Sequence, residues 1–409
     1  MSKDVNSGSD RPAKRVLIAL IGKPYSVDRR SQLQVATLVE HGYRVTVVCP
    51  AGPGEAACEE INGVRFYRFP FPPERRGKLD FFREYAHSLC SVMRLSWKAL
   101  RNEGWDIIQA ANPPDILFII AGFYKRFFGK RFVFDNRDIS PEIFAIRFGK
   151  SDRSLIIRFL LWLERRTYRT ADAVMAVNES VKGLAVGRGG KDPSRVFVVR
   201  CGIDSKRFKP VPPQPDLRMG RRYLVCYAGV MGVQDSVDNL VRTIHHVVHE
   251  RGRTDISFVL LGDGDELERL TALAGDLGVD EYTSFPGFVR DDDLLLAYMS
   301  TADVCVSPES KNPFNDMCSF VKINEYLAMG KPVVLFDLVE ARKSAGDAAV
   351  YVTPNDTSEF GDKIIDLLDD PAECARMGKI ALERSAGLLS WEHSQAHFLA
   401  AYDRLFSNT

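Results

Sequence analysis

Long apolar runs are missing from the sequence, which argues against a membrane-spanning helix. The first run, Val16–Ile21, has six residues and the next, Ile116–Gly122, is scarcely longer, whereas a spanning helix needs about 20. A run of this length fits a buried strand and is too short for the core of a secretory signal. We therefore expect a cytoplasmic protein with a polar, disordered tail over residues 1–14.

Cysteine pairs and metal-ligand spacings are missing as well. The eight cysteines are scattered and none forms a Cys-x-x-Cys pair, so we interpret them as reduced thiols and not as disulfides or a zinc site. His245, His246 and His249 lie on a predicted helix and are interpreted as helix-surface residues and not as a metal site. No Gly-x-Gly-x-x-Gly follows a predicted strand, which argues against a nicotinamide dehydrogenase.

A net charge of only +1 hides an uneven distribution. Residues 1–205 hold 34 Lys and Arg against 22 Asp and Glu, and the rest of the chain holds 21 against 32. Ordinary surface solvation explains this asymmetry, and so does a basic half that faces an anionic membrane or a phosphorylated lipid acceptor. Phe69–Lys78 with Phe81 and Phe82, and Lys125–Arg131, mix aromatic with basic residues, as a peripheral membrane site would. Single-stranded nucleic acid selects a similar mix, but nothing else indicates it, and we predict no nucleic-acid partner.

Strands and helices alternate along both halves of the chain, which predicts an α/β fold. Apolar strands at Val16–Ile21 and Val45–Cys49 flank a helix at Ser31–His41, the pattern of a right-handed βαβ unit with a parallel sheet. The alternation restarts after the proline-rich segment Pro210–Pro215. Further strands are expected at 106–110, 131–134, 173–177, 196–199, 223–227, 256–261, 285, 303–306 and 332–336, and helices at 114–128, 154–169, 236–250, 265–277, 320–329 and 357–406.

The segment Asn312–Ser344 carries the strongest chemical pattern. Ser319 is a candidate N-cap, which puts Lys322 in the first turn of a helix and Glu325 three residues later on the same face. A helix N-terminus binds phosphate, a lysine there adds charge for a diphosphate, and a glutamate one turn deeper can accept both hydroxyls of a ribose. The alternative is a capped surface helix with a Lys–Glu pair worth only a few tenths of a kcal/mol.

Glu325–Val334, read as E-Y-L-A-M-G-K-P-V-V, resembles the E-Y-x-A-x-G-K-P-V-V block of family-4 glycosyltransferases, close to the branch that builds bacterial surface polysaccharides. Further matches follow in order over residues 15–406: Asp135–Asp138 with Pro141-Glu142, Val199–Asp204 with Phe208 and Pro210, Tyr227–Gly229, Leu261–Gly264, Phe285–Gly287, Ala302-Asp303, Ser307-Pro308 and Ser390-Trp391. The resemblance implies the GT-B fold, two facing Rossmann-like domains with parallel sheets. It implies a first, acceptor domain at 15–209, joined by a returning helix at 390–409, and a nucleotide-sugar domain at 216–389.

The resemblance also implies an activity. Such enzymes move a sugar from a nucleotide-diphosphate-sugar to an acceptor hydroxyl with retention of configuration, without a metal or another cofactor. We expect a lipid-linked or polysaccharide-precursor glycan as acceptor. Catalysis then consists mainly of stabilising the leaving diphosphate with cations and helix ends. Lys322 is the first candidate for that role and Arg290 a second and weaker one, because a solvated arginine before Asp291–Asp293 explains Arg290 better. Substrate contacts are expected at Glu325, Gly229, Gly262, Gly287 and Ser319.

The chain departs from the family pattern in three places. Many relatives carry a Glu eight residues before the Glu325 position, where this chain has Met317; Asp316, Glu309 or backbone amides then contact the donor sugar. The loop Val230–Ser236 lacks the usual Arg and Lys. A histidine of the acceptor-side block is replaced by Asn136-Arg137, which leaves Asp138 as the nearest carboxylate for an acceptor base, with an N-cap or an ion pair to Arg137 as the alternative.

The loop after the first strand replaces the family's double glycine with Gly22-Lys-Pro. Gly22 would let the backbone approach the diphosphate. Asp28 with Arg29 or Arg30 precedes the first helix, where a phosphate would dock, or else these are a helix-start Asp and solvated arginines.

Two acidic segments are candidates for a metal site. Asp263–Asp265 and Asp291–Asp293 match the Asp-x-Asp metal motif of the other glycosyltransferase fold, but both lie at strand ends or helix starts of the second domain, where helix capping is the better explanation.

Two alternatives compete with the transferase hypothesis. A sugar-nucleotide epimerase of the same fold would need convergent carboxylates that we do not find. A non-catalytic sugar-nucleotide or membrane-binding protein would account for the three departures.

Overall fold

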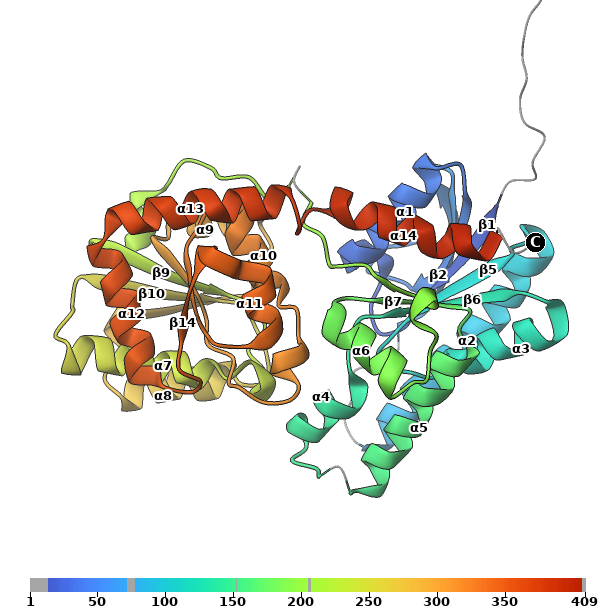
Figure 1. The fold of residues 1–409 in the computed structure, drawn as a ribbon, viewed down its shortest axis with the longest axis horizontal. Coiled ribbons are helices and arrows are strands. Elements are labelled where there is room, and N and C mark those ends of the chain that lie inside the picture. The colour runs from blue at the N-terminus through green and yellow to red at the C-terminus, as the bar shows by residue number, and fades with distance from the viewer. Residues whose placement is uncertain (1–13, 72–77, 152, 205–206, 407–409) are drawn as a thin grey trace, which may run out of the picture.

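The computed structural model describes residues 14–71, 78–151, 153–204 and 207–406, and only the backbone of residues 78–82. The chain forms two α/β lobes that lie side by side, each with a central sheet covered by helices (Figure 1). The predicted tail over 1–14 lies almost wholly outside the described residues, and so do residues 72–77 of the first aromatic–basic stretch. Within the described residues, no helix is both long and apolar enough to cross a bilayer.

The first lobe holds an eight-stranded sheet whose strands pair in parallel except at one edge. Its spatial order is β3 (Cys58–Ile61), β4 (Val64–Phe69), β2 (Arg44–Pro50), β1 (Arg15–Ala19), β5 (Ile107–Ala111), β6 (Arg131–Asn136), β7 (Ala173–Ala176) and β8 (Val196–Val198). The antiparallel β3–β4 hairpin turns at Asn62-Gly63, both with positive φ, as a two-residue type I′ turn requires. This hairpin was not predicted from the sequence.

The second lobe holds a six-stranded, fully parallel sheet. Its order is β11 (Thr283–Gly287), β10 (Ile256–Leu261), β9 (Tyr223–Ala228), β12 (Val304–Ser307), β13 (Val333–Phe336) and β14 (Ala349–Val352). This is the doubly wound Rossmann order, in which the chain reverses direction beside the central strand and ligands bind at the carboxyl ends. The predicted fold class is therefore confirmed.

Helices cover both faces of each sheet. The first lobe has α1 (Arg29–Glu40), α2 (Lys78–Asn102), α3 (Phe118–Phe128), α4 (Ser140–Arg147), α5 (Leu155–Thr170) and α6 (Glu179–Gly187). The second has α7 (Val237–His245), extended by a π turn over His246–Glu250, then α8 (Leu267–Asp276), α9 (Asp292–Thr301), α10 (Val321–Ala328), α11 (Val339–Ala345), α12 (Thr357–Asp369) and α13 (Pro371–Ala386). The last helix, α14 (Trp391–Phe406), lies on the first lobe (Figure 1).

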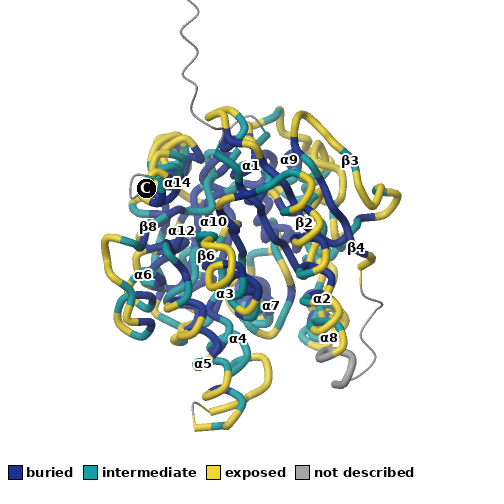
Figure 2. Tube along the Cα trace, turned by 90° about the vertical axis from the view of Figure 1, so that its right-hand side faces the viewer, coloured by how far each residue is buried: buried dark blue, intermediate teal, exposed yellow. Residues whose placement is uncertain are grey.

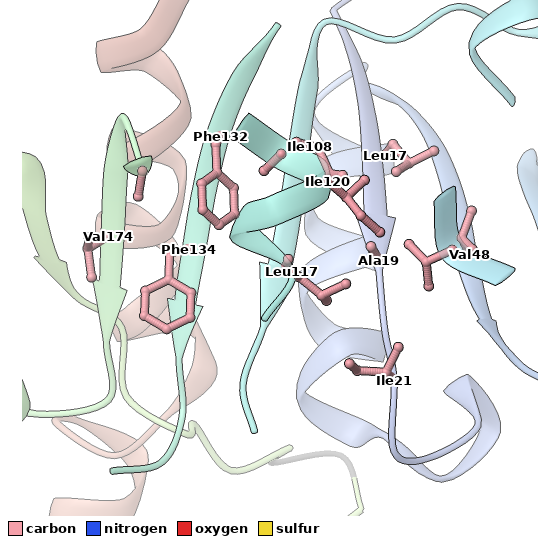
Figure 3. Packing of buried hydrophobic residues seen from close by; sticks show 14 of the residues in the cluster. Leu17, Ala19, Ile21, Val48, Ile108, Leu117, Ile120, Phe132, Phe134 and Val174 are labelled. Carbon is pink, nitrogen blue, oxygen red and sulfur yellow. The ribbon is translucent and has the colours of Figure 1, made fainter. Parts of the chain in front are cut away.

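Apolar strands make the core of each lobe. Strand residues such as Leu17, Ile108 and Phe132 are fully buried and pack beneath α3 through Leu117 and Ile120 (Figure 3). The Cα trace coloured by burial shows the strands dark at the centre and the connecting loops exposed at the rim (Figure 2). Strands buried on both faces account for the continuous apolar runs in the sequence.

The helical stretch predicted at 357–406 is in fact three helices. Asp370 caps α13 through its carboxylate and Pro371 occupies the first position, where proline is tolerated at a helix start but not inside a helix. After Gly387 the chain crosses to the first lobe, where the indole Nε1 of Trp391 donates to Thr37 Oγ1 at 2.9 Å. The phenol of Tyr402 donates to Gln109. These contacts fasten α14 to the first lobe, as the fold class predicted.

Candidate functional site

A cleft of about 900 Å³ lies between the lobes and is lined by residues of both. The first lobe contributes residues that follow β1 and β6 and the start of α1, and the second contributes residues that follow β9 and the start of α10. All these segments lie at carboxyl ends of parallel strands or at helix N-termini, the expected place for a ligand. The lining includes seven predicted site residues: Lys322, Asp138, Glu325, Asp28, Arg29, Gly229 and Ser319.

The N-terminus of α10 opens into this cleft. Ser319, Phe320, Val321 and Lys322 all line it, and no side chain caps the helix. The prediction that Ser319 is the N-cap was wrong: Phe320 holds that position, and the Ser319 hydroxyl instead accepts from the Asn178 amide of the first lobe at 2.9 Å. An uncapped helix end carries free N–H groups and partial positive charge, and this favours an anion.

Lys322 is not a free cation at this helix end. Its side chain is buried, with the ammonium in an ion pair with Glu309, 3.5 Å from an Asp235 oxygen and 3.0 Å from the Tyr227 hydroxyl. Burial alone would lower the pKa of Lys322, but Glu309, Tyr227 and Asp235 together outweigh it and raise this pKa well above its usual range. The pKa of Asp235 is raised by its burial, which Lys322 only partly offsets. Lys322 thus keeps its positive charge, but the neighbouring carboxylates offset that charge locally.

Glu325 lies one turn further along α10 and also lines the cleft. Among the described residues its carboxylate makes no hydrogen bond. Burial raises the pKa of Glu325 to about 7 against the opposing charges of Arg207, Arg29 and Lys322. A desolvated carboxylate without a partner costs free energy unless a ligand supplies donors, so Glu325 is free to accept hydrogen bonds from a bound molecule.

Two arginines, neither of them part of the second lobe's sheet, bring positive charge near Glu325. Arg207 lies in the segment that connects the two lobes, and two of its guanidinium nitrogens form an ion pair with Asp292. Arg29, at the start of α1, lies 3.7 Å from Asp292. Arg29 keeps 54% of its side chain exposed, so it can exchange this weak bridge for a better anion. Arg207 was not predicted as a site residue, although it directly precedes Phe208 of the family-like segment.

A buried network of ion pairs lies at the first-lobe wall of the cleft. Asp135 is fully buried between Arg30, at 2.7 Å, and Arg137, at 2.8 Å. Those two arginines lower the pKa of Asp135 strongly despite its burial. Arg137 also pairs with Asp28 at 2.6 Å, and Asp28 caps α1 by accepting from the Ser31 N–H. Asp28 therefore has a structural position, and its predicted contact with phosphate stays a prediction.

Asp138 faces the cleft beside this network. The alternative of an ion pair with Arg137 was wrong, since Arg137 pairs with Asp28 and Asp135, and the N-cap of α4 is Ile139. Burial raises the pKa of Asp138, against the nearby charges of Arg137 and Lys23. Its main chain is held by Asn112, which accepts from the Asp138 N–H at 3.2 Å and donates to its carbonyl at 2.6 Å. Within the described chain, its carboxylate accepts no hydrogen bond.

Three predicted glycines lie together at neighbouring strand ends. A Cβ atom on Gly262 would lie 1.8 Å from the Gly229 carbonyl oxygen, and the Gly262 N–H donates to the Gly287 carbonyl at 2.9 Å. Only glycine permits this approach at the positive φ of Gly262. Gly229 lines the cleft, whereas Gly262 and Gly287 support it from behind. Their direct contact with substrate stays a prediction.

Three other predicted residues lie outside the cleft lining. Arg290 is exposed, Asp316 pairs with Lys311 at 2.9 Å and accepts from the Val339 N–H, and Gly22 turns with φ of 92°. The two Asp-x-Asp segments have capping or surface positions, with Asp291 as the N-cap of α9. Among the described residues, no group of three or more His, Cys, Asp or Glu is placed to hold a metal.

Two facing Rossmann-type lobes with a polar cleft at their strand ends define a GT-B-type protein. Comparisons with known proteins agree with this class. The model for "Glycosyltransferase Family 4" matches residues 32–207, and that for "Glycosyl transferases group 1" matches residues 222–370. The two matches cover most of both lobes, and the chain belongs to the family-4 glycosyltransferases.

Individual relatives are distant. An MMP alpha-(1->4)-mannosyltransferase of Mycolicibacterium hassiacum is 24% identical over 66% of this chain and 62% of its own length. Sucrose-phosphate synthase of Thermosynechococcus elongatus has a TM-score of 0.78 at 18% identity, covering 97% of this chain and all of that one. Anabaena Alr3699/HepE, solved with UDP and glucose, has a TM-score of 0.72 at 16% identity, covering 96% and 100%. The first curated relatives are matched over only 57% to 66% of their lengths.

Proposed function

We propose that this protein is a retaining glycosyltransferase that moves a sugar from a nucleotide-diphosphate-sugar to an acceptor hydroxyl. The observation that carries the proposal is Glu325: a carboxylate in the cleft without a hydrogen-bond partner among the described residues, one turn from the uncapped N-terminus of α10. This arrangement suits a ribose on the carboxylate and a diphosphate on the helix end. Family membership and the UDP complex of the HepE neighbour support a nucleotide-sugar donor.

In this proposal the leaving diphosphate is stabilised from both lobes. The α10 amides and the Lys322 ammonium act from one side, and Arg29, Lys23 and Arg207 from the other. Preorganised positive charge of this kind lowers the barrier because it meets negative charge that grows in the transition state. No carboxylate need attack the sugar, since the acceptor enters from the face the diphosphate leaves. No metal or other cofactor is invoked in this scheme.

Asp138 is our candidate for the group that assists the acceptor hydroxyl. It lines the first-lobe wall and its carboxylate has no hydrogen-bond partner among the described residues. Its raised pKa makes it a better proton acceptor than an ordinary aspartate, provided that it is ionised at the working pH. We propose a lipid-linked or polysaccharide-precursor glycan as the acceptor, because of the basic first half of the chain.

Ligand-induced stabilisation tests the donor site directly. A ligand that binds only the folded state must raise the melting temperature, so a panel of UDP- and GDP-sugars should contain at least one that stabilises the wild-type protein. Glu325→Ala should lose that shift, while Glu268→Ala, an exposed glutamate on α8, should keep it. An unchanged shift in Glu325→Ala rejects the ribose role. NMR of the anomeric product then tests retention, and turnover in EDTA tests metal independence.

A further inference from the structure

The outward face of α5 carries large apolar side chains that nothing in the described chain covers. Leu155 is 81% exposed, Phe159 50% and Trp162 47%, and their spacing of four and three residues puts them on one side of the helix. The Phe159 and Trp162 rings stack at 6.0 Å between centroids. Single exposed apolar residues are ordinary, but a row of three, two of them aromatic, marks an interaction surface.

Arginines lie in and beside this row. Arg158, Arg165, Arg166 and Arg169 are exposed on the same helix, and among the described residues none of them forms an ion pair with a carboxylate. The guanidinium of Arg166 lies 5.4 Å from the Trp162 ring centroid. The one acidic residue of α5, Glu164, is buried and paired with Arg188. Residues 147–170 hold seven Lys and Arg against two Asp and Glu. At helical spacing Arg166 lies in line with the apolar row, and Arg158, Arg165 and Arg169 lie along one side of it.

The helix α5 is next to α4, whose N-terminal end borders the cleft. Ile139 and Ile143, at the start of α4, line the cleft beside Asp138, and α4 runs outward and packs on α5. The two helices project together beyond the rest of the lobe, beside the gap between the lobes (Figures 1 and 2). At the tip, Phe148 is 54% exposed, and its ring lies 4.4 Å from that of Phe144.

We propose that Leu155, Phe159 and Trp162 insert into the interface of an anionic lipid bilayer, with the α5 arginines on the headgroups. An apolar row bordered by cations is the pattern of a helix that lies in the membrane plane. Anionic phosphates supply the charge that these arginines lack in the protein. The inference rests on the proposed function in one respect: α4 would then hold the acceptor side of the cleft near a membrane-anchored acceptor.

The α5 face is a better candidate than the stretches that the sequence indicated. In Lys125–Arg131, Lys125 pairs with Asp172 at 2.6 Å and Lys130 lies over the Trp105 ring, 3.7 Å from Asp106. Cations already engaged within the protein have less charge to offer to lipid. The other stretch, Phe69–Lys78 with Phe81 and Phe82, lies mostly outside the residues whose side chains are described.

Vesicle flotation of the full chain tests the proposal. The wild-type protein should float with vesicles of phosphatidylcholine and phosphatidylglycerol, and much less with phosphatidylcholine alone. Arg165→Glu/Arg166→Glu should weaken binding about tenfold or more, since each cation near an anionic surface contributes a factor of about five. Arg242→Glu/Lys379→Glu, the same charge change on exposed second-lobe sites, should float like wild type. Equal loss in both variants, or no flotation of wild type, overturns the proposal.

Tryptophan fluorescence locates the contact. Vesicles should shift the emission to the blue, and Trp162→Phe should remove most of the shift. Trp97→Phe should retain it, because Trp97 is also partly exposed but lies on α2. A shift that survives in Trp162→Phe overturns the assignment of the face. A stable dimer of wild type that Phe159→Ala/Trp162→Ala converts to monomer would show that a second copy covers α5, and this also overturns it.

Neither test needs a nucleotide. Sugar-nucleotide stabilisation in solution needs no vesicle, so the α5 variants should keep it at wild-type size. Loss of lipid binding with intact sugar-nucleotide binding is therefore distinguishable from failure of the proposed function, which shows as absent stabilisation in wild type.

Discussion

The two faces of the cleft hold their buried charges differently. On the first lobe two cations meet two carboxylates, so the network is balanced and every charge has a partner. On the second lobe a single cation meets two carboxylates, one of them with a raised pKa. The first set is Arg30, Arg137, Asp28 and Asp135, and the second is Lys322, Glu309 and Asp235.

This difference shows where charge for a diphosphate can come from. Lys322 is already committed to Glu309, so its charge alone gives the second lobe little net attraction for phosphate. The exposed cations at the cleft are Lys23 and Arg29, each with 54% of its side chain accessible, and both belong to the first lobe. Recognition of an anion therefore needs both faces, and substitutions at Lys322, Arg137, Glu325 and Asp292 can break or sharpen this comparison.

Replacing Lys322 should have the largest effect. In Lys322→Ala, the buried Glu309 and Asp235 lose their cation, and breaking a buried pair in this way costs about 3–5 kcal/mol. Chemical denaturation measures the change. Turnover should fall more than donor affinity, as for a group that acts on the leaving diphosphate.

The double substitution Lys322→Met/Glu309→Gln separates these two roles. Removing both charges of a buried pair is far less costly than removing one, so stability should largely return while turnover does not. Recovery of turnover together with stability would show that Lys322 serves only the fold.

Arg137→Met is the corresponding change on the first lobe. It leaves Asp28 without its nearest cation, but Asp135 still has Arg30, so we expect a smaller loss of stability, about 2–3 kcal/mol. Donor-induced stabilisation measured by thermal shift should be retained. A loss as large as that of Lys322→Ala would contradict the view that the balanced network is the more tolerant one.

A feature of the fold or site could be predicted from the sequence where the residues that form it are close together in the chain. Apolar strands and helix starts are local patterns, and β1, β2, β9, β10 and α10 lie within two residues of their predicted ends. The missed β3–β4 hairpin had a local signal, the Asn62-Gly63 pair. Lys322 and Glu325 could be placed at the cleft because their spacing on one helix is local as well.

The partners of those side chains could not be predicted in this way. Glu309 and Asp235 reach Lys322 from loops 13 and 87 residues away in the chain. No periodicity links such positions, because β9 and β12 bring their loops together only when the sheet forms. The same holds for the ion pair of Arg137 with Asp28, whose members are 109 residues apart in the chain.

The pH dependence of donor binding should report on Glu325. Its pKa of about 7 lies above the ordinary value for glutamate, so the carboxylate becomes a full acceptor only as the pH rises through 7. The dissociation constant of a nucleotide-sugar, whose diphosphate does not titrate there, should fall a few-fold over that range. Titration calorimetry measures it, and Glu325→Gln should bind more weakly with a flat profile.

The same shift gives a signed prediction for stability. A carboxyl whose pKa is raised on folding stabilises the fold below its ordinary pKa, and this contribution is lost as the pH rises through the folded value. The gain in stability of Glu325→Gln over wild type should therefore grow between about pH 5 and about pH 8. A gain that shrinks over this range would contradict the raised pKa.

Asp292 should have the smallest effect and the most specific one. It holds Arg207 and, weakly, Arg29 at the second lobe, with nearly half of its own side chain exposed. Exposed pairs contribute about 0–1 kcal/mol, so Asp292→Asn should hardly change stability. It releases two cations beside Glu325, however, and should tighten nucleotide-sugar binding a few-fold at low salt, with the gain screened at high salt. Asp293→Asn removes the same charge one residue along, where no arginine of the described residues forms an ion pair, and should not change affinity. Equal affinities in wild type and Asp292→Asn would mean that Arg29 and Arg207 do not meet the diphosphate, and the second lobe would then bind it with the α10 amides and the neutralised Lys322 alone.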